Sequence, residues 1–192
     1  MVEFLRTYIQ PLLAEAERPK KWRHSPSAKG RVHKHCGIIN LGCVCYMISM
    51  LQQLFMVPQF RYQFLKAVDN TPPDMKEYKG DMIDDNLLRQ MQTLFGYLEL
   101  SDRAAYSPKE ICFAFKDFSG QPTAIGEQKD SHEFLGLLFD RLEQSLKPTS
   151  QRDLLKDIFD HNACSQLICQ SCGATRNKVE VNHTLTLPVI RT

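Results

Sequence analysis

Residues 40–55 read NLGCVCYMISMLQQLF, a glycine turn followed by two cysteines and an almost unbroken apolar run. Only three polar side chains interrupt the apolar residues between positions 45 and 57, which predicts a buried helix. A helix N-terminus presents unpaired backbone N–H groups and about half a positive charge. Both favour a thiolate over a thiol, and the N–H groups can also donate to an oxyanion. Cys45, in the first turn, is therefore a candidate nucleophile.

Two residues ahead of this cysteine could serve the same chemistry. Gly42 would let the backbone approach closely, and Asn40 could supply a side-chain donor to the oxyanion. The same spacing also fits Cys45 as a small buried apolar residue, which cysteine often is. The residues alone leave both interpretations open.

Helical patterns continue after a polar loop that contains TPPDMKEYKGD. Asp84 and Asp85 are expected to open an amphipathic helix whose core stripe is Leu87, Met91, Leu94 and Leu98. At SPKE the sequence predicts a capping box with proline at the first helical position, made by Ser107, Pro108 and Glu110.

A further helix is expected from about residue 131 to 146, with Asp130 and Glu133 as its capping pair. Its apolar face carries Phe134, Leu135, Leu138, Leu142 and Leu146. The period then changes to two in NKVEVNHTLTLPV, which predicts a half-buried strand through Val179, Val181, Leu185, Leu187 and Val189. SQLIC is the expected hairpin partner and CQSCG the turn between them. Helices first and strands last indicate an α+β fold.

The N-terminal part of the chain differs in composition from the rest. Residues 1–17 space their apolar side chains as an amphipathic helix does. Residues 18–36 are expected to form a basic linker, since seven Lys or Arg and no acidic residue lie between positions 18 and 34. Removing these seven charges from the net charge of +2 leaves −5 for the remainder. The Pro, Ser and Gly of this segment favour a solvated linker over a nucleic-acid site.

The cysteine count and the absence of long apolar stretches bear on the compartment. No apolar run reaches the roughly 18 residues that span a membrane, and the N-terminus has no signal-peptide cleavage site. Seven cysteines at spacings unlike a disulfide framework indicate a reducing environment. We therefore expect an intracellular protein, cytoplasmic or nuclear or both, with no membrane partner.

Three stretches resemble motifs of the ubiquitin-specific proteases, the papain-like deubiquitinases. GIINLGCVCYMISMLQQLF, residues 37–55, is similar to the cysteine box G-L-x-N-x-G-[NA]-T-C-Y-M-N-S-x-L-Q-x-L. GEQKDSHEFLGLLFDRLE, residues 126–143, resembles the Q-Q-D-A-H-E-F-L box, and ICQSCGATRNKVEVNHTLTLPV the first zinc-knuckle pair with the strand after it. The resemblance implies a papain-like domain over 37–192, with a helical thumb over 37–160 and the start of the fingers over 161–192.

The resemblance also assigns roles to single residues. It places Cys45 as the nucleophile and Asn40 as the residue that helps to bind the oxyanion. It places Gln128 and Asp130 beside the channel for the extended C-terminal tail of ubiquitin. The chain departs from the family pattern in having Cys43 for Asn or Ala, Val44 for Thr and Ile48 for Asn. None of these departures removes the nucleophile.

Two parts of the family pattern are not found in this sequence. None of the six histidines lies in a stretch like the later Gly-His-Tyr box, so we expect the N-terminal half of a catalytic domain, with little or no hydrolysis on its own. Cys169 and Cys172 have zinc-knuckle spacing, but tetrahedral zinc needs four ligands. A structural zinc site would thus be incomplete here. A pair without metal, and a local site completed by His161 and Cys164, are the alternatives.

The function that the resemblance implies is thiol-dependent deubiquitination. Such an enzyme hydrolyses the bond after the C-terminal glycine of ubiquitin, and its partners are ubiquitin and ubiquitinated proteins. The three departures in the cysteine box leave one alternative open, a non-catalytic ubiquitin-binding scaffold that keeps the fold.

Overall fold

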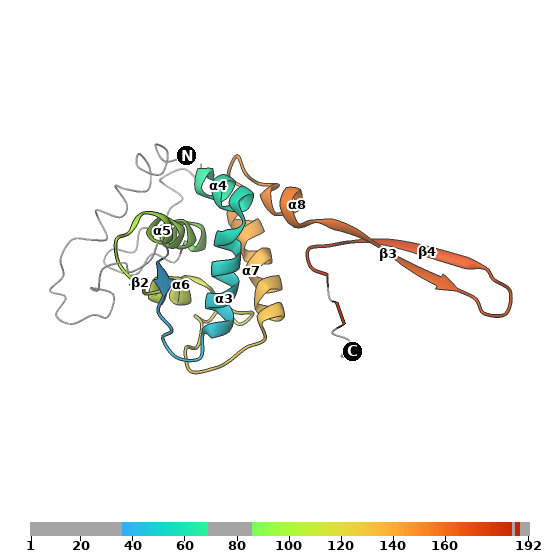
Figure 1. The fold of residues 1–192 in the computed structure, drawn as a ribbon, viewed down its shortest axis with the longest axis horizontal. Coiled ribbons are helices and arrows are strands. Elements are labelled where there is room, and N and C mark those ends of the chain that lie inside the picture. The colour runs from blue at the N-terminus through green and yellow to red at the C-terminus, as the bar shows by residue number, and fades with distance from the viewer. Residues whose placement is uncertain (1–35, 69–85, 186, 189–192) are drawn as a thin grey trace.

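The computed structural model describes residues 36–68, 86–185 and 187–188 (Figure 1). The predicted helix over 1–17, the basic linker up to residue 35, and Asp84 with Asp85 lie outside these residues, so the predictions for them stay untested. In chain order the described elements are β1 (Gly37–Ile38), α3 (Cys45–Met56), α4 (Pro58–Lys66), α5 (Leu87–Leu100), β2 (Ala105–Tyr106), α6 (Lys109–Ala114), α7 (Ser131–Leu146), α8 (Leu154–Phe159), β3 (His161–Ile168) and β4 (Thr175–Asn182).

A helical body and a long hairpin make up the described structure (Figure 1). Helix α3 packs against α4 and α7, and α5 packs against α4, α6 and α7. The centre of the body is aromatic: the Phe60 and Phe64 rings stack with centroids 5.1 Å apart, and Phe64 lies 5.5 Å from Phe95. All three side chains are fully buried, as are Met47 and Leu51 of α3. Burial of this apolar face fixes α3 in the middle of the body.

The sequence located most helices correctly. Helix α3 begins at the predicted cysteine, α7 has the predicted bounds, and the predicted stripe of α5 is buried at all four positions. Helix α5 begins at Leu87, and the Asn86 side chain caps it by accepting from the Arg89 N–H at 3.0 Å. Helices α4 and α8 were not predicted, although Pro58 at the start of α4 is a recognised start signal.

The capping box predicted at SPKE is wrong. Helix α6 begins at Lys109, so Pro108 is the N-cap residue and makes no side-chain cap hydrogen bond. The ψ angle of Pro108 is 20°, outside the helical range, which moves the start of the helix one residue beyond the position that the sequence indicated.

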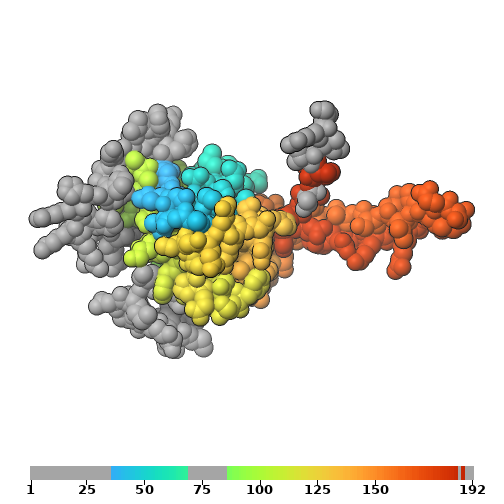
Figure 2. Space-filling model, turned by 90° about the horizontal axis from the view of Figure 1, so that it is seen from below, coloured from blue at the N-terminus to red at the C-terminus, as the bar shows by residue number. Residues whose placement is uncertain are grey.

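The hairpin was predicted in the right place but with the wrong burial. β3 pairs with β4 antiparallel, with Cys164 opposite Val179 and residues 169–174 as the connection. The expected half-buried strand is wrong within the described residues, because the apolar positions of 179–187 are exposed: Val179 65%, Val181 62%, Leu185 66% and Leu187 71%. The hairpin projects away from the helices, so no described element covers either face (Figures 1 and 2). β4 also ends at Asn182, before the two leucines.

The base of the hairpin is tied to the helical body. Asp160 Oδ1 lies 2.5 Å from Nδ1 of His183, and the His183 and Phe139 rings form a T-shaped pair with centroids 5.8 Å apart. Phe159, at the end of α8, contacts both Phe139 and Phe60. The observed mixture of helices and strands fits the α+β class that the order of the elements predicted. Within the described residues, no helix combines the length and the apolar character that crossing a membrane requires.

Candidate active site

The turn that carries the cysteines is fixed by contacts on both sides. At its start, Gly37 and Ile39 donate N–H groups to Ala104 and Tyr106 at 2.8 Å, which pairs β1 with β2 in parallel. Inside the turn, the Asn40 side-chain oxygen accepts from the Gly42 N–H at 3.2 Å.

Beyond Asn40, two further contacts hold the turn. The Cys43 N–H donates to the Ile125 carbonyl at 2.7 Å. Val44 is completely buried and closes the turn against the core. Helix α3 therefore begins at a fixed place.

Cys45 is the first residue of α3 and its side chain is exposed. The alternative interpretation, a small buried apolar residue, is therefore wrong. The N-cap residue is Val44, whose side chain has no acceptor for the N–H groups of the first turn. These donors lie beside the thiol with no capping side chain competing for them. An exposed thiol at an uncapped helix start suits attack on a carbonyl whose oxygen then needs donors.

The three residues that depart from the family pattern lie in different surroundings. Val44 occupies a fully buried position, where an apolar side chain avoids burying the hydroxyl that Thr would bring. Ile48 is half-buried against the core cluster. Cys43 is exposed. None of the three occupies the place of the Cys45 thiol.

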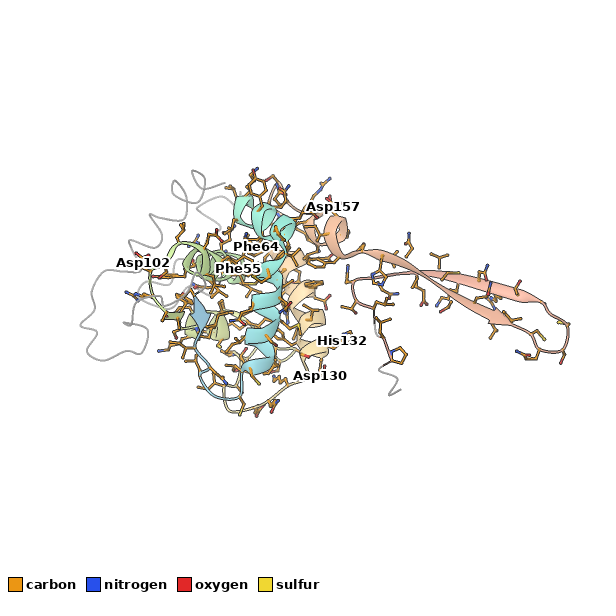
Figure 3. The ribbon with its side chains drawn as sticks, viewed as in Figure 1. Phe55, Phe64, Asp102, Asp130, His132 and Asp157 are labelled. Atoms are coloured by element: carbon orange, nitrogen blue, oxygen red, sulfur yellow. The ribbon has the colours of Figure 1, made fainter. Side chains whose placement is uncertain are left out.

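The start of α7 lies beside the start of α3. Tyr46 and Phe134 meet edge to face at 5.4 Å, which joins the first turns of the two helices. Figure 3 shows Asp130 and His132 at this end of α7, next to the beginning of α3. Asp130 caps α7 by accepting from the N–H groups of His132 at 2.7 Å and Glu133 at 3.1 Å. The predicted cap by Asp130 is confirmed, and the two positive helix ends face the same region.

These cap bonds lower the pKa of the Asp130 carboxyl below its ordinary value, chiefly through the Glu133 N–H and then the His132 N–H. A lowered pKa in the folded state means that the charged cap stabilises the fold above the ordinary carboxyl range and is lost as pH falls through the folded value. We expect Asp130→Asn to lower the thermal midpoint of the domain at pH 7 and to lose this difference towards pH 3.

Asp153→Asn is the comparison, because Asp153 is the N-cap residue of α8 without a side-chain cap bond, and its carboxylate pairs instead with Arg152 at 3.1 Å on the surface. At pH 7 this variant should lower the thermal midpoint by less than Asp130→Asn does, because an exposed ion pair stabilises little. A constant difference for Asp130→Asn between pH 7 and pH 3 would contradict the prediction.

Two buried groups flank the cysteine turn without being candidates for its chemistry. Burial, then the nearby Cys112, Glu127 and Cys45, raises the pKa of the Tyr46 hydroxyl, so it stays neutral beside the thiol. Burial raises the pKa of Cys112 to about 11, and its thiol contacts the Met47 sulfur at 3.9 Å. Cys112 is therefore a packing residue, whereas the thiols of the turn reach solvent.

Cys169 and Cys172 lie together at the tip of the hairpin. The Gly173 N–H donates to the Cys169 carbonyl at 2.9 Å, and Gly173 has a φ of 68°, which favours glycine. N–H groups of Cys172 and then Ser171, with the Cys172 thiol, lower the pKa of Cys169. A stabilised thiolate next to a second thiol could supply two of the four ligands that tetrahedral zinc needs.

The local zinc site with His161 and Cys164 is wrong. Cys164 lies four strand residues before the end of β3 at Ile168, and a strand rises about 3.3 Å per residue, which separates it from the tip by more than about 13 Å. His161 is farther still, at the base of the hairpin. In the part of the chain that the structure describes, no three His, Cys, Asp or Glu side chains gather as a metal site.

Comparison with known proteins agrees with this geometry. A family model described as ubiquitin carboxyl-terminal hydrolase matches residues 36–189. The chain belongs to this family. The resemblance to the ubiquitin-specific proteases, drawn from three motifs, is thereby confirmed.

Several relatives in this family share most of the chain. Ubiquitin carboxyl-terminal hydrolase puf of Drosophila melanogaster is 31% identical over 170 residues, 88% of this chain and 4% of the relative. Human ubiquitin carboxyl-terminal hydrolases 34 and 24 are 28% and 29% identical, covering 94% and 96% of the chain. The chain spans 5% and 7% of their lengths.

The structure thus brings together most of the residues that the sequence singled out. Asn40 and Cys45 share one turn, and Asp130 starts the neighbouring helix, with exposed Gln128 two residues before it. Cys169 and Cys172 lie elsewhere, at the hairpin tip. Sequence reasoning missed Ile125, whose carbonyl contacts the cysteine turn, because a backbone acceptor leaves no signal in residue type or periodicity.

Proposed function

We propose that this chain carries the nucleophile of a deubiquitinase that cleaves the bond after the C-terminal glycine of ubiquitin. The observation that supports it best is the exposed Cys45 at the first position of α3, on a turn held by β2, Asn40 and Ile125. Membership in the hydrolase family supplies the substrate class.

The reaction would run through an acyl-enzyme. The Cys45 thiolate attacks the glycine carbonyl, and the oxygen takes up negative charge near the Asn40 side chain and the N–H groups at the start of α3. Collapse of this intermediate breaks the bond to the amine, which takes a proton from a histidine. Water, deprotonated by the same histidine, then hydrolyses the thioester and releases ubiquitin.

The histidine is proposed to come from the rest of the full-length protein. Of the described histidines, His183 pairs with Asp160 and His161 lies at the foot of β3, both at the base of the hairpin. His132 lies in the first turn of α7 and is exposed. By resemblance to the family's second box, it is a helix residue rather than the base.

Ubiquitin and its conjugates are the proposed partners, and Gln128 and Asp130 are the proposed contacts for its tail. Both are exposed at the end of α7 that adjoins the start of α3. The basic side chains of that tail match the −5 charge outside the N-terminal linker. Cys169 and Cys172 would contribute two of four ligands to a structural zinc, which would fix the hairpin tip. The five exposed cysteines, Cys43, Cys45, Cys164, Cys169 and Cys172, carry free thiols, as expected for the proposed reducing, intracellular compartment.

The test is labelling of the full-length protein with ubiquitin that carries a C-terminal electrophile. We expect one adduct, placed on Cys45 by mass spectrometry of the peptide that contains both cysteines of the turn. Tight binding of the probe without an adduct would establish the scaffold alternative. An adduct on Cys43 would also contradict the assignment.

A further inference from the structure

A loop from outside the cysteine box touches the cysteine turn through its backbone. A Cβ atom added to Gly42 would lie 2.5 Å from the Ile125 carbonyl oxygen and 3.4 Å from its carbon. Real Cβ atoms do not approach backbone oxygen so closely, so only glycine fits here. The next residue, Cys43, donates its N–H to the same oxygen at 2.7 Å. Figure 2 shows the surfaces of the two segments adjoining, blue beside yellow.

This hydrogen bond divides the donors of the turn into two groups. The Cys43 N–H is already used by Ile125, so it is not available to an oxyanion. The donors left near the Cys45 thiol are the Asn40 side-chain amide and the N–H groups at the start of α3. The Ile125 carbonyl therefore occupies the Cys43 N–H, and it leaves the N–H groups at the start of α3 available to an oxyanion.

The loop itself is fixed to the elements on either side. The Thr123 N–H donates to the Cys112 carbonyl of α6 at 2.9 Å, and the Glu127 N–H donates to Ala124 at 3.2 Å. Upstream, Arg141 of α7 donates to the Asp117 carbonyl at 3.0 Å. Downstream the chain enters the Asp130 cap of α7. The Ile125 carbonyl is thus held relative to α6 and α7.

We propose that the Ile125 carbonyl is a positioning group that sets the place of Cys45 relative to the start of α7. In this proposal, position 42 requires glycine because the Ile125 carbonyl, rather than the substrate, occupies the space that a Cβ atom would fill. The proposal rests on the proposed function for its effect on catalysis. Misplacing a reacting group by about 1 Å can cost roughly 100-fold in rate.

The experiment compares Gly42→Ala with one control variant of the full-length protein in hydrolysis of a ubiquitin–fluorophore conjugate. Gly42→Ala should lower kcat by about 100-fold while the ubiquitin affinity, measured in a Cys45→Ser background, stays within about threefold. Gly126→Ala is the matched control, because a Cβ there meets nothing within 4 Å. This control should keep kcat within about threefold.

Several results would overturn the proposal. One is a Gly42→Ala variant that keeps its kcat, and another is a variant that loses only ubiquitin affinity, which would mean that Gly42 makes room for the substrate. Equal losses in Gly126→Ala would show general sensitivity of the loop.

Two readouts do not depend on ubiquitin. Iodoacetamide should alkylate Cys45 at least about threefold more slowly in Gly42→Ala, because the thiol moves from its place at the helix start. In the unchanged protein the Cys43 amide should exchange its hydrogen slowly although the residue is exposed, and fast exchange would overturn the proposal even if Gly42→Ala did not fold. If the unchanged protein hydrolyses nothing while these two results hold, the proposed function fails and the positioning role stands.

Discussion

Replacing Cys45 by serine is expected to lower hydrolysis of a ubiquitin conjugate by at least about 10⁴-fold, whereas Cys43→Ser should leave it within about threefold. Cys45 is the first residue of α3 and is exposed beside the uncapped N–H groups of that helix. Serine is close to cysteine in size, but its neutral hydroxyl is a much weaker nucleophile than a thiolate. Cys43 lies before the helix, with its N–H bound to Ile125.

The two substitutions form a matched pair, because both thiols are exposed and the residues are separated only by Val44. The measurement is the single-turnover rate of the full-length protein with a ubiquitin–fluorophore conjugate. Equal losses in both variants would mean that the turn as a whole, rather than one thiol, carries the activity. A Cys45→Ser variant that keeps the unchanged rate would remove the nucleophile assignment altogether.

The helices could be predicted from the sequence where an apolar stripe and an end signal agreed. Helix α7 has both, since Asp130 caps it and its apolar residues recur at helical spacing over four turns. Helix α8 is six residues long, too short for a stripe to stand out from the surrounding apolar residues. In α6 the capping residues were present in the sequence, but the ψ angle of Pro108 delayed the helix by one position.

The hairpin shows a different limit of sequence patterns. Alternation of apolar residues identified β4, and the Cys-x-x-Cys turn identified its partner β3. Alternation of apolar and polar residues indicates that one face of the strand is apolar enough to be buried. It does not show whether another segment of the protein covers that face. Val179 and Val181 accordingly lie on an exposed face of a projecting hairpin.

Sequence patterns identified those residues of the candidate site that act through their side chains. They did not identify Ile125, which acts through its backbone carbonyl. Asn40, Cys45 and Asp130 each carry a chemical group that a motif can select. The contribution of Ile125 is a carbonyl oxygen, which every residue type supplies equally. The one sequence signal for this contact is Gly42, because a glycine in a turn indicates that another group lies close to its backbone. The glycine does not indicate which group that is.

Asn40 is expected to provide the second largest effect on catalysis. Its side-chain oxygen accepts from the Gly42 N–H at 3.2 Å, so Nδ2 is the group that it can offer to the oxyanion. We expect Asn40→Ala to lower kcat by about 10² to 10³-fold, the usual loss for one oxyanion donor. Alanine, however, removes the turn contact together with the donor, so this variant alone does not separate the two roles.

Asn40→Asp separates them, because aspartate keeps the oxygen that accepts from Gly42 and replaces only the donor. If Asn40 acts on the oxyanion, Asn40→Asp should lose at least as much kcat as Asn40→Ala, since a carboxylate also repels the developing negative charge. If Asn40 acts only by shaping the turn, Asn40→Asp should recover most of the rate lost in Asn40→Ala. Ubiquitin affinity in a Cys45→Ser background should be similar for both variants, because the oxyanion exists only once the thiolate has attacked. The order of the two kcat values therefore decides whether this asparagine stabilises the transition state or the turn.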